Sequence, residues 1–468
     1  MNIKLKFMGA AGNVTGSRFL LQANGITLLI DCGFFQERQF QKRNWEPFAV
    51  PPSQIDAVLL THAHLDHCGL LPKLVREGFS GKIYCTGATG EIARVVIQDS
   101  AKIQMEDAKY KKKRHAKKKY TPPRPVVPLY EPQDALACDP LFATVDYEQP
   151  LQLAGDMEAT YYNAGHILGS AMIKLDVRQG GEKRTILFSG DIGRWNVPIL
   201  QDPTLMEQAD YVLCESTYGD RLHQTNTDIK ERLAAVINET DAAGGNIVIP
   251  SFAVERSQEL LYYLNELVVE DRIPNLLTFL DSPMAVKVTD VFRKYPDLYD
   301  AETLEHLNDN NSPFSFAGLQ MTPQTSQSKA INHIRGTVII IAGSGMCTGG
   351  RVKHHLVNNI SRPESTVLFV GYQAVGTLGR SLLDGPEKVR IFGEKRDVKA
   401  RIERLSGFSG HADRDEIERW LSSLKNEPKK LFLIHGEEES SKALAKHLKE
   451  KKGWQAIVPN YVDEVTLD

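Results

Sequence analysis

The densest group of metal-binding side chains is the run Thr61-His62-Ala63-His64-Leu65-Asp66-His67, which directly follows an apolar stretch over residues 57–60. Three imidazoles and one carboxylate within six residues suit a borderline divalent cation, above all zinc, because zinc accepts both nitrogen and oxygen donors. A single ion cannot easily use all four. His62 and His64 can point one way while Asp66 and His67 point another, which is the arrangement that a two-metal site needs.

Further candidate donors follow later apolar stretches. His166 comes after Asn163-Ala164-Gly165 and an expected strand over residues 159–162, and Asp191 closes Phe188-Ser189-Gly190 after an expected strand over residues 185–188. Taken alone, either residue would more often belong to a turn or a helix cap than to a metal site. We treat both as candidate ligands because they belong to a larger set of such donors.

The elements that must position these residues alternate between short apolar strands and helices. The apolar runs predict strands over residues 26–30, 57–60, 185–188, 211–213, 246–249, 338–341, 366–370 and 431–434. Apolar residues recurring on one helical face predict helices over residues 229–242, 257–269 and 415–424. This alternation predicts the α/β fold class.

The composition is that of a globular chain. Of 468 residues, 42% are hydrophobic and 25% charged, and 56 Lys and Arg against 59 Asp and Glu give a formal net charge of −3. Any nucleic-acid binding must therefore use a local surface rather than a global basic field. No signal peptide or membrane span is expected, and the six scattered cysteines include no CxxC pair. These features predict a cytoplasmic protein with reduced thiols.

The donor residues carry a resemblance to a known family. The pattern at residues 62–67, His166 after a glycine, and Asp191 after Ser189-Gly190 resemble motifs two to four of the metallo-β-lactamase superfamily. Asp31, in Leu29-Ile30-Asp31-Cys32-Gly33, resembles motif one. Residues 213–219, 408–413 and 433–437 resemble motifs A, B and C of the β-CASP nucleases, which include the cleavage and polyadenylation specificity endonuclease subunit and its bacterial and archaeal relatives. The resemblance covers almost the whole chain.

The resemblance implies a fold and a domain order. We expect a four-layered αββα metallo-β-lactamase fold interrupted by an inserted α/β β-CASP domain. The expected boundaries are 1–206 for the first part of the metallo-β-lactamase domain, 207–385 for the β-CASP domain, and 386–468 for the second part of the metallo-β-lactamase domain. The insertion is needed because His435 must return to Asp191 after some two hundred residues.

The resemblance also implies a site with two Zn²⁺ per chain. One ion would be held by His62, His64 and His166 and the other by Asp66, His67 and His435, with Asp191 between them. Two such ions can share a hydroxide nucleophile and neutralise charge that builds on a phosphodiester. Asp31 is expected to hydrogen-bond a ligand imidazole rather than bind metal. Asp66, Glu215 and His411 are the candidate catalytic residues.

Glu215 has two interpretations, and the role of His411 depends on which of them holds. Glu215 follows an apolar strand and could simply cap the next element. In the resembled family the motif A acid lies beside the motif B histidine. A carboxylate in that place raises the pKa of the imidazole and orients it, so His411 could donate a proton to the departing 3′-oxygen.

Two Gly-rich turns, at residues 342–351 and 371–380, follow expected strands. Backbone amides in such turns can cradle phosphates, although neither turn fits a Walker A loop or a dinucleotide-binding fingerprint. The usual explanation of a lone Gly-rich turn is tight geometry. Because similar turns recur in β-CASP sequences, Ser344, Gly345, Arg351 and Arg380 are candidate contacts to an RNA backbone. Residues 251–256 and 281–285 also resemble family segments, without a role that the residues themselves indicate.

The run from Lys109 to Lys119 holds eight Lys or Arg residues. Such a run is most often a solvated helix end. It could also bind phosphates, but only Tyr110 and Tyr120 are available to stack on bases. Its role stays open.

These observations favour a zinc-dependent endonuclease that cuts single-stranded RNA and leaves 3′-hydroxyl and 5′-phosphate ends. A homodimer is compatible with them. No membrane partner is expected. Alternatives are a DNA-repair nuclease of the same superfamily and a non-catalytic RNA-processing scaffold. His435 argues against the first, because DNA-specific relatives tend to carry an apolar residue at motif C. The complete ligand set argues against the second. The β-CASP segment argues against a small-substrate thioester or lactam hydrolase.

Overall fold

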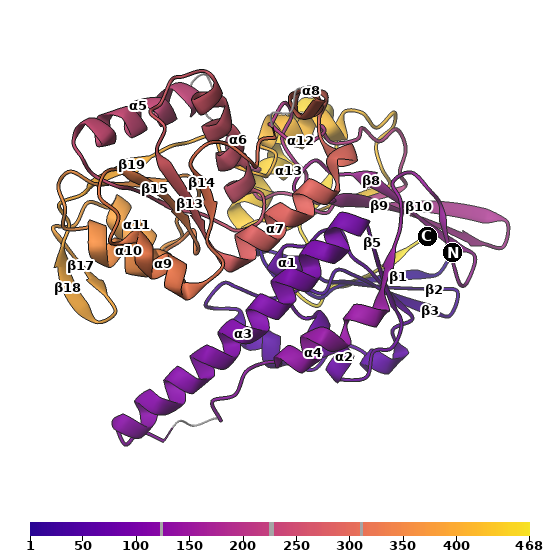
Figure 1. Cartoon of the computed structure of the whole chain (residues 1–468). Coiled ribbons are helices and arrows are strands. Elements are labelled where there is room, and N and C mark those ends of the chain that lie inside the picture. Colours follow the sequence, from indigo (N-terminus) through magenta and orange to yellow (C-terminus); the bar gives the residue numbers. More distant parts are fainter. Residues whose placement is uncertain (122–124, 224–228, 309–311) are drawn as a thin grey trace. The chain divides into compact units, whose positions relative to one another are not determined.

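The computed structural model describes residues 1–121, 125–223, 229–308 and 312–468 (Figure 1). The chain forms two compact units. Unit 1 consists of Met1–Trp195, Asp202–Leu222 and His411–Asp468, and unit 2 consists of Asn196–Gln201 and His223–Gly410. The domain boundaries expected from the sequence, 206/207 and 385/386, are a different partition and remain a proposal.

Unit 1 contains two seven-stranded sheets. The first has the order β22-β1-β2-β3-β4-β5-β6 and the second the order β21-β20-β11-β10-β9-β8-β7. The strands of the first sheet are β22 Glu464–Leu467, β1 Ile3–Phe7, β2 Phe19–Ala23, β3 Ile26–Ile30, β4 Ala57–Leu59, β5 Lys82–Cys85 and β6 Phe142–Thr144. Those of the second are β21 Ala456–Ile457, β20 Lys430–Ile434, β11 Tyr211–Glu215, β10 Glu182–Phe188, β9 Ala171–Gln179, β8 Met157–Asn163 and β7 Leu151–Leu153.

The two sheets of unit 1 share a hydrophobic core. In the second sheet Ile186, Phe188 and Leu213 alternate with Leu187 and Val212, because successive side chains of a strand point to opposite faces. The first set packs against β1 to β4 of the other sheet. The second set packs against α12 Arg414–Leu421 and α13 Glu438–Lys452. Burial on both faces explains why these strands appear as continuous apolar runs.

The remaining helices of unit 1 are α1 Leu65–Cys68, α2 Leu71–Arg76, α3 Gly87–Lys117 and α4 Pro132–Ala137. Thr86 caps the start of α3 by accepting a hydrogen bond from the Thr89 amide. In Figure 1 the last turns of α3 extend away from the sheets of its unit. Among the described residues, no helix combines the length and the apolar character that a membrane crossing requires.

Unit 2 is built on a parallel six-stranded sheet of order β14-β13-β15-β12-β16-β19. Its strands are β12 Ile247–Pro250, β13 Leu277–Asp281, β14 Leu319–Met321, β15 Val338–Ala342, β16 Thr366–Phe369 and β19 Arg401–Arg404, and a separate hairpin pairs β17 Lys388–Ile391 with β18 Glu394–Asp397. Its helices are α5 Ile229–Ala242, α6 Arg256–Val269, α7 Pro283–Lys294, α8 Ala301–Asn308, α9 Thr325–Ile331, α10 Val352–Asn359 and α11 Leu378–Leu383. The α/β class and each strand and helix expected from the sequence are confirmed.

Candidate active site

The predicted donors of unit 1 lie just beyond the ends of strands. His62 and His64 lie between β4 and α1, and Asp66 and His67 belong to α1. The other donors follow three strands of the second sheet, namely His166 after β8, Asp191 after β10 and His435 after β20. The structure brings them together in two clusters.

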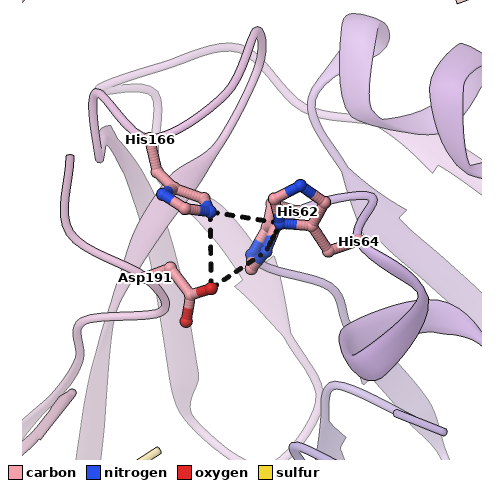
Figure 2. A group of neighbouring side chains, drawn as sticks. All are labelled: His62, His64, His166 and Asp191. Atoms are coloured by element: carbon pink, nitrogen blue, oxygen red, sulfur yellow. Dashed lines mark hydrogen bonds and ion pairs between the residues drawn. The ribbon is translucent and has the colours of Figure 1, made fainter. Parts of the chain in front are cut away.

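The first cluster consists of His62, His64, His166 and Asp191 (Figure 2). His64 Nδ1 lies 3.1 Å from His62 Nε2 and 3.1 Å from His166 Nε2. Asp191 Oδ2 lies 3.4 Å from each of those two Nε2 atoms. Ligands about 2.0–2.1 Å from a tetrahedral zinc ion are themselves about 3.3 Å apart. These four atoms therefore have the spacing of ligands around one such ion.

The second cluster consists of Asp66, His67 and His435 and faces the other oxygen of Asp191. His67 Nε2 and His435 Nε2 are 3.1 Å apart, and Asp66 Oδ2 lies 3.5 Å from His435 Nε2. Asp191 Oδ1 is 3.3 Å from His67 Nε2 and 3.5 Å from His435 Nε2. Although buried, this oxygen accepts no hydrogen bond from any described residue. A buried anionic oxygen in that state is costly, so a cation is the partner that fits it.

The protonation of these side chains also suits a metal. Burial lowers the pKa of His64 to about 3, and it lowers the pKa of His62 and His166 as well, which leaves their lone pairs free to coordinate. Burial opposes the charge on Asp191, yet the neighbouring histidines hold the pKa of this carboxyl well below its ordinary value. The first cluster thus offers neutral imidazoles and an ionised carboxylate. In the second cluster burial opposes protonation, but the charge of Asp191 raises the pKa of His67 and His435, so a metal bound there must displace their protons.

Residues behind the ligands fix their orientation. Asp31 Oδ2 lies 2.7 Å from His67 Nδ1, and Asp31 Oδ1 accepts a hydrogen bond from the Thr61 amide at 2.8 Å. A carboxylate on Nδ1 leaves Nε2 directed at the cluster. Thr217 Oγ1 lies 3.1 Å from His435 Nδ1 and also donates to the His435 carbonyl at 2.8 Å. The supporting contacts of Thr61 and Thr217 were not predicted; only the place of Thr61 next to one motif and of Thr217 within another could have indicated them.

Glu215 and His411 form a pair beside the first cluster. His411 Nδ1 lies 3.2 Å and 3.1 Å from the two carboxylate oxygens of Glu215, and 3.8 Å from Asp191 Oδ2. Glu215 is fully buried, and the Ile192 amide donates to its Oε1 at 2.6 Å. Burial would lower the pKa of His411, but the charges of Glu215 and Asp191 raise it to about 9. The two carboxylates thus favour the protonated form of His411, which Glu215 holds at one nitrogen.

The four candidate RNA contacts belong to unit 2: Ser344, Gly345 and Arg351 lie between β15 and α10, and Arg380 lies on α11. Ser344 Oγ accepts hydrogen bonds from two amides of its own loop, those of Thr348 and Gly349. The Arg351 guanidinium donates to Asp281 Oδ1 at 2.7 Å and to the carbonyls of Thr322 and Pro323. Arg380 pairs with Asp384 at 2.9 Å. The structure therefore turns Arg351 toward its own unit, and RNA contact by any of the four remains a prediction.

The basic run lies on the last turns of α3 and the residues that follow. All eight of its Lys and Arg side chains are exposed, and none forms an ion pair with another described residue.

Comparison with known proteins identifies the protein family to which the chain is similar. The family model for the metallo-beta-lactamase superfamily matches residues 12–136, that for the Beta-Casp domain matches residues 257–382, and that for the Zn-dependent metallo-hydrolase RNA specificity domain matches residues 395–459. Ribonuclease TTHA0252 of Thermus thermophilus is 40% identical over 440 residues, which are 94% of each chain. Transcription termination factor FttA of Methanocaldococcus jannaschii is 29% identical over 99% of this chain and 72% of its own length.

A solved structure shows a related fold. A protein of unknown function from Enterococcus faecalis V583 superposes with a TM-score of 0.56 at 10% identity, over 100% of both chains, which shows similarity of fold alone. The family models and the 40% identical relative confirm the resemblance that the motifs indicated. The chain belongs to the β-CASP nucleases of the metallo-β-lactamase superfamily and is accordingly a metal-dependent hydrolase.

Proposed function

We propose that this chain is a zinc-dependent endonuclease that hydrolyses single-stranded RNA and leaves 3′-hydroxyl and 5′-phosphate ends. The carrying observation is Asp191, whose two oxygens face two separate clusters of imidazoles. A relative aligned over 94% of both chains is named a ribonuclease, and the match to an RNA specificity domain spans His411 and His435.

Two zinc ions are the metals that the donor set fits. His62, His64 and His166 would hold one, Asp66, His67 and His435 the other, and Asp191 would serve both. When bound, such a pair activates a water as the nucleophile at neutral pH and neutralises charge on the phosphodiester. The donor set consists of five imidazoles and two carboxylates, and neighbouring donor atoms are 3.1–3.5 Å apart. This set supports zinc over magnesium, because magnesium prefers oxygen ligands.

In this proposal the chain's own residues orient the ligands and supply the proton for the leaving oxygen. Asp31 keeps the His67 ring in place through Nδ1, and Thr217 does the same for His435. Glu215 and Asp191 favour the protonated form of His411, which would give its proton to the 3′-oxygen as the bond from that oxygen to phosphorus breaks. The oxygen of water then remains on phosphorus. The proton and the oxygen together yield a 3′-hydroxyl and a 5′-phosphate.

Two other functions are less well supported. A scaffold would not need a complete and buried set of donors such as this one. The proteins named transcription termination factor FttA are matched over only part of their length, 72% in the relative above, whereas the ribonuclease is matched over 94%. The ribonuclease is therefore the better guide to this chain's activity.

The deciding experiment is cleavage of end-labelled RNA and DNA of matched sequence by protein whose metal content has been measured. We expect internal cuts in single-stranded RNA, slower cutting of the matched duplex, and 5′ ends that a kinase labels only after phosphatase treatment. Asp191→Asn, which removes the shared carboxylate, is the inactive control. Cutting of DNA alone would identify the DNA-repair alternative, and binding of RNA without cleavage would identify the scaffold.

A further inference from the structure

Phe252 is an exposed aromatic residue within an otherwise buried segment of unit 2. Residues 247–262 are buried apart from Phe252, which is 41% exposed. It follows β12, the strand that pairs with both β15 and β16 in the middle of the parallel sheet. The carboxyl ends of these strands meet at one edge, which is where open α/β sheets bind ligands.

The ring rests on two glycines from the neighbouring strands. Gly345 follows β15 and Gly371 follows β16. A methyl group on Gly345 would lie 2.8 Å from Phe252 Cδ2, and one on Gly371 would lie 3.5 Å from Phe252 Cε2. Gly345 has no room for a side chain, so the two backbones support the same edge of the ring.

This support is itself fixed by a buried side chain. Gln373 is 4% exposed, and its Nε2 donates to the Gly345 carbonyl at 2.9 Å and to the Gly371 carbonyl at 3.2 Å. On the other side the Ser257 hydroxyl donates to the Phe252 carbonyl at 2.6 Å. A large apolar side chain is thus held in a set position at the surface rather than left mobile.

We propose that Phe252 is a stacking platform for one nucleobase of the bound RNA, a role that rests on the RNA substrate proposed above. Every base has an apolar π-face, and stacking on a pre-positioned aromatic ring needs no particular sequence. Arg351, on the same loop as Gly345, is already bound to Asp281. At this edge of the sheet Phe252 therefore offers a base contact, whereas Arg351 is not free to offer a cationic contact to phosphate. Tyr372, next to Gly371 and 51% exposed, adds a second aromatic residue to this surface.

The test compares Phe252→Leu, Phe252→Trp and the control Phe392→Leu, which removes another exposed ring of unit 2 (55% exposed). We expect Phe252→Leu to raise KM for RNA roughly 5- to 150-fold with little change in kcat, the usual loss when one stacked base is released. Phe252→Trp should retain the parent KM, and Phe392→Leu should not change it.

A series of RNAs, each with one base replaced by an abasic site, locates the contact. One position should weaken binding to the parent protein but not to Phe252→Leu, because the two changes remove the same contact. The proposal is wrong if no position couples to Phe252, or if Phe252→Leu changes only the oligomeric state, which would assign the ring to a protein interface.

Should the parent cut no RNA, the proposed function fails, and the stacking proposal is decided by fluorescence alone. The emission of Phe252→Trp, after subtraction of the parent's, should then be quenched by intact RNA and not by fully abasic RNA. Equal emission with both would overturn the stacking role.

Discussion

His67 Nε2 and His435 Nε2 lie 3.1 Å apart, although 368 residues separate them in the chain. The contact exists because β20 returns to pair in parallel with β11, with Glu215 opposite Ile434, after the chain has passed through the whole of unit 2. His67 follows β4 of the first sheet, so the second donor cluster forms only when β20 has joined the second sheet and the two sheets have packed together. Metal binding there should be coupled to that assembly.

The protein should carry close to two zinc ions per chain, because seven donors are too many for one tetrahedral ion. Asp191→Ala should lose metal more readily than Asp31→Ala, since Asp191 faces both clusters whereas Asp31 only orients His67. Elemental analysis of both variants after dialysis measures this. One ion per chain, mostly iron, or equal loss in the two variants would contradict the assignment.

His435→Ala should abolish or severely reduce RNA cleavage while the protein stays folded. The variant removes a donor of the second cluster, but β20 remains held by the buried side chains of Leu431, Phe432 and Leu433. His447→Ala, a histidine of α13 that pairs with Glu418, is the matched control and should keep full activity. Cleavage rates and circular dichroism of the two variants separate loss of activity from loss of fold, and full activity of His435→Ala would refute the motif C assignment.

The sequence predicted the strands and helices that a run of neighbouring residues is enough to indicate. The strands β11 and β20 are buried on both faces and so appear as apolar runs, and α5 has the expected bounds, Ile229–Ala242. By contrast β7, Leu151–Leu153, has only three residues, an exposed Gln152 between two half-buried leucines, and is too short to show any periodicity. Residue types at strand ends likewise marked the donors His62 and Asp191, which the structure brings together, although metal binding by them stays a prediction.

Contacts between distant segments could not be predicted in this way. That Thr217 supports His435 depends on the register of β11 against β20, which no residue pattern states. The orientation of Arg351 is another case, because a Gly-rich turn suggests a phosphate contact and only the structure shows the guanidinium bound to buried Asp281. The exposure of Phe252 could not be predicted either, because the residues around it are apolar or small.

Asp281→Asn should destabilise unit 2 by roughly 3–5 kcal/mol at pH 7, because it breaks a buried charge network. Asp281 is fully buried and binds Arg351 at 2.7 Å, His355 at 2.6 Å and Ser328 at 2.5 Å. Burial opposes its charge, yet these hydrogen bonds hold its pKa below the ordinary 3.8. Denaturant unfolding of the variant against the parent measures the difference.

The stability difference from Asp281 should depend on pH in one direction. A carboxyl whose pKa is lowered by folding contributes stability above its unfolded pKa and loses that contribution as the pH falls through the folded value. The gap between parent and Asp281→Asn should thus be constant near neutrality and shrink only below about pH 4. Asp384→Asn, at an exposed pair with Arg380, should change stability by less than about 1 kcal/mol. A stability difference between the parent and Asp281→Asn that grows in acid would contradict the stabilising role of the charge network.

If the basic run binds phosphates, its loss should weaken RNA binding and flatten the salt dependence of that binding, without slowing cleavage of bound RNA. The variant replaces Lys111, Lys112, Lys113 and Arg114 by Ser. For each phosphate of a single strand that the variant no longer neutralises, the slope of log K against log salt should fall by about 0.7. The control replaces Lys442, Lys446, Lys449 and Lys451 of α13, where two of the lysines already pair with Glu438 and Glu450. An unchanged slope would identify the run as a solvated helix end.

His411→Ala separates proton transfer from metal binding, because His411 lies beside the donor clusters and is bonded to Glu215. Loss of a positioned acid should slow RNA cleavage by roughly 10²- to 10⁴-fold. Zinc content and RNA affinity should barely change, in contrast to His435→Ala, which should lose metal from the second cluster. Elemental analysis and binding measurements on both variants establish this contrast before any rate is interpreted.

A substrate with a better leaving group then decides the chemistry of His411. In an RNA whose scissile 3′-oxygen is replaced by sulfur, the departing thiolate needs no proton, so the absence of the acid should matter little. This substrate should restore much of the missing rate in His411→Ala and little in His435→Ala, where the deficit lies in the metal site. If His411→Ala loses zinc, or if sulfur gives no recovery, then His411 is a ligand or a positioning residue, and proton donation by the Glu215 and His411 pair must be abandoned.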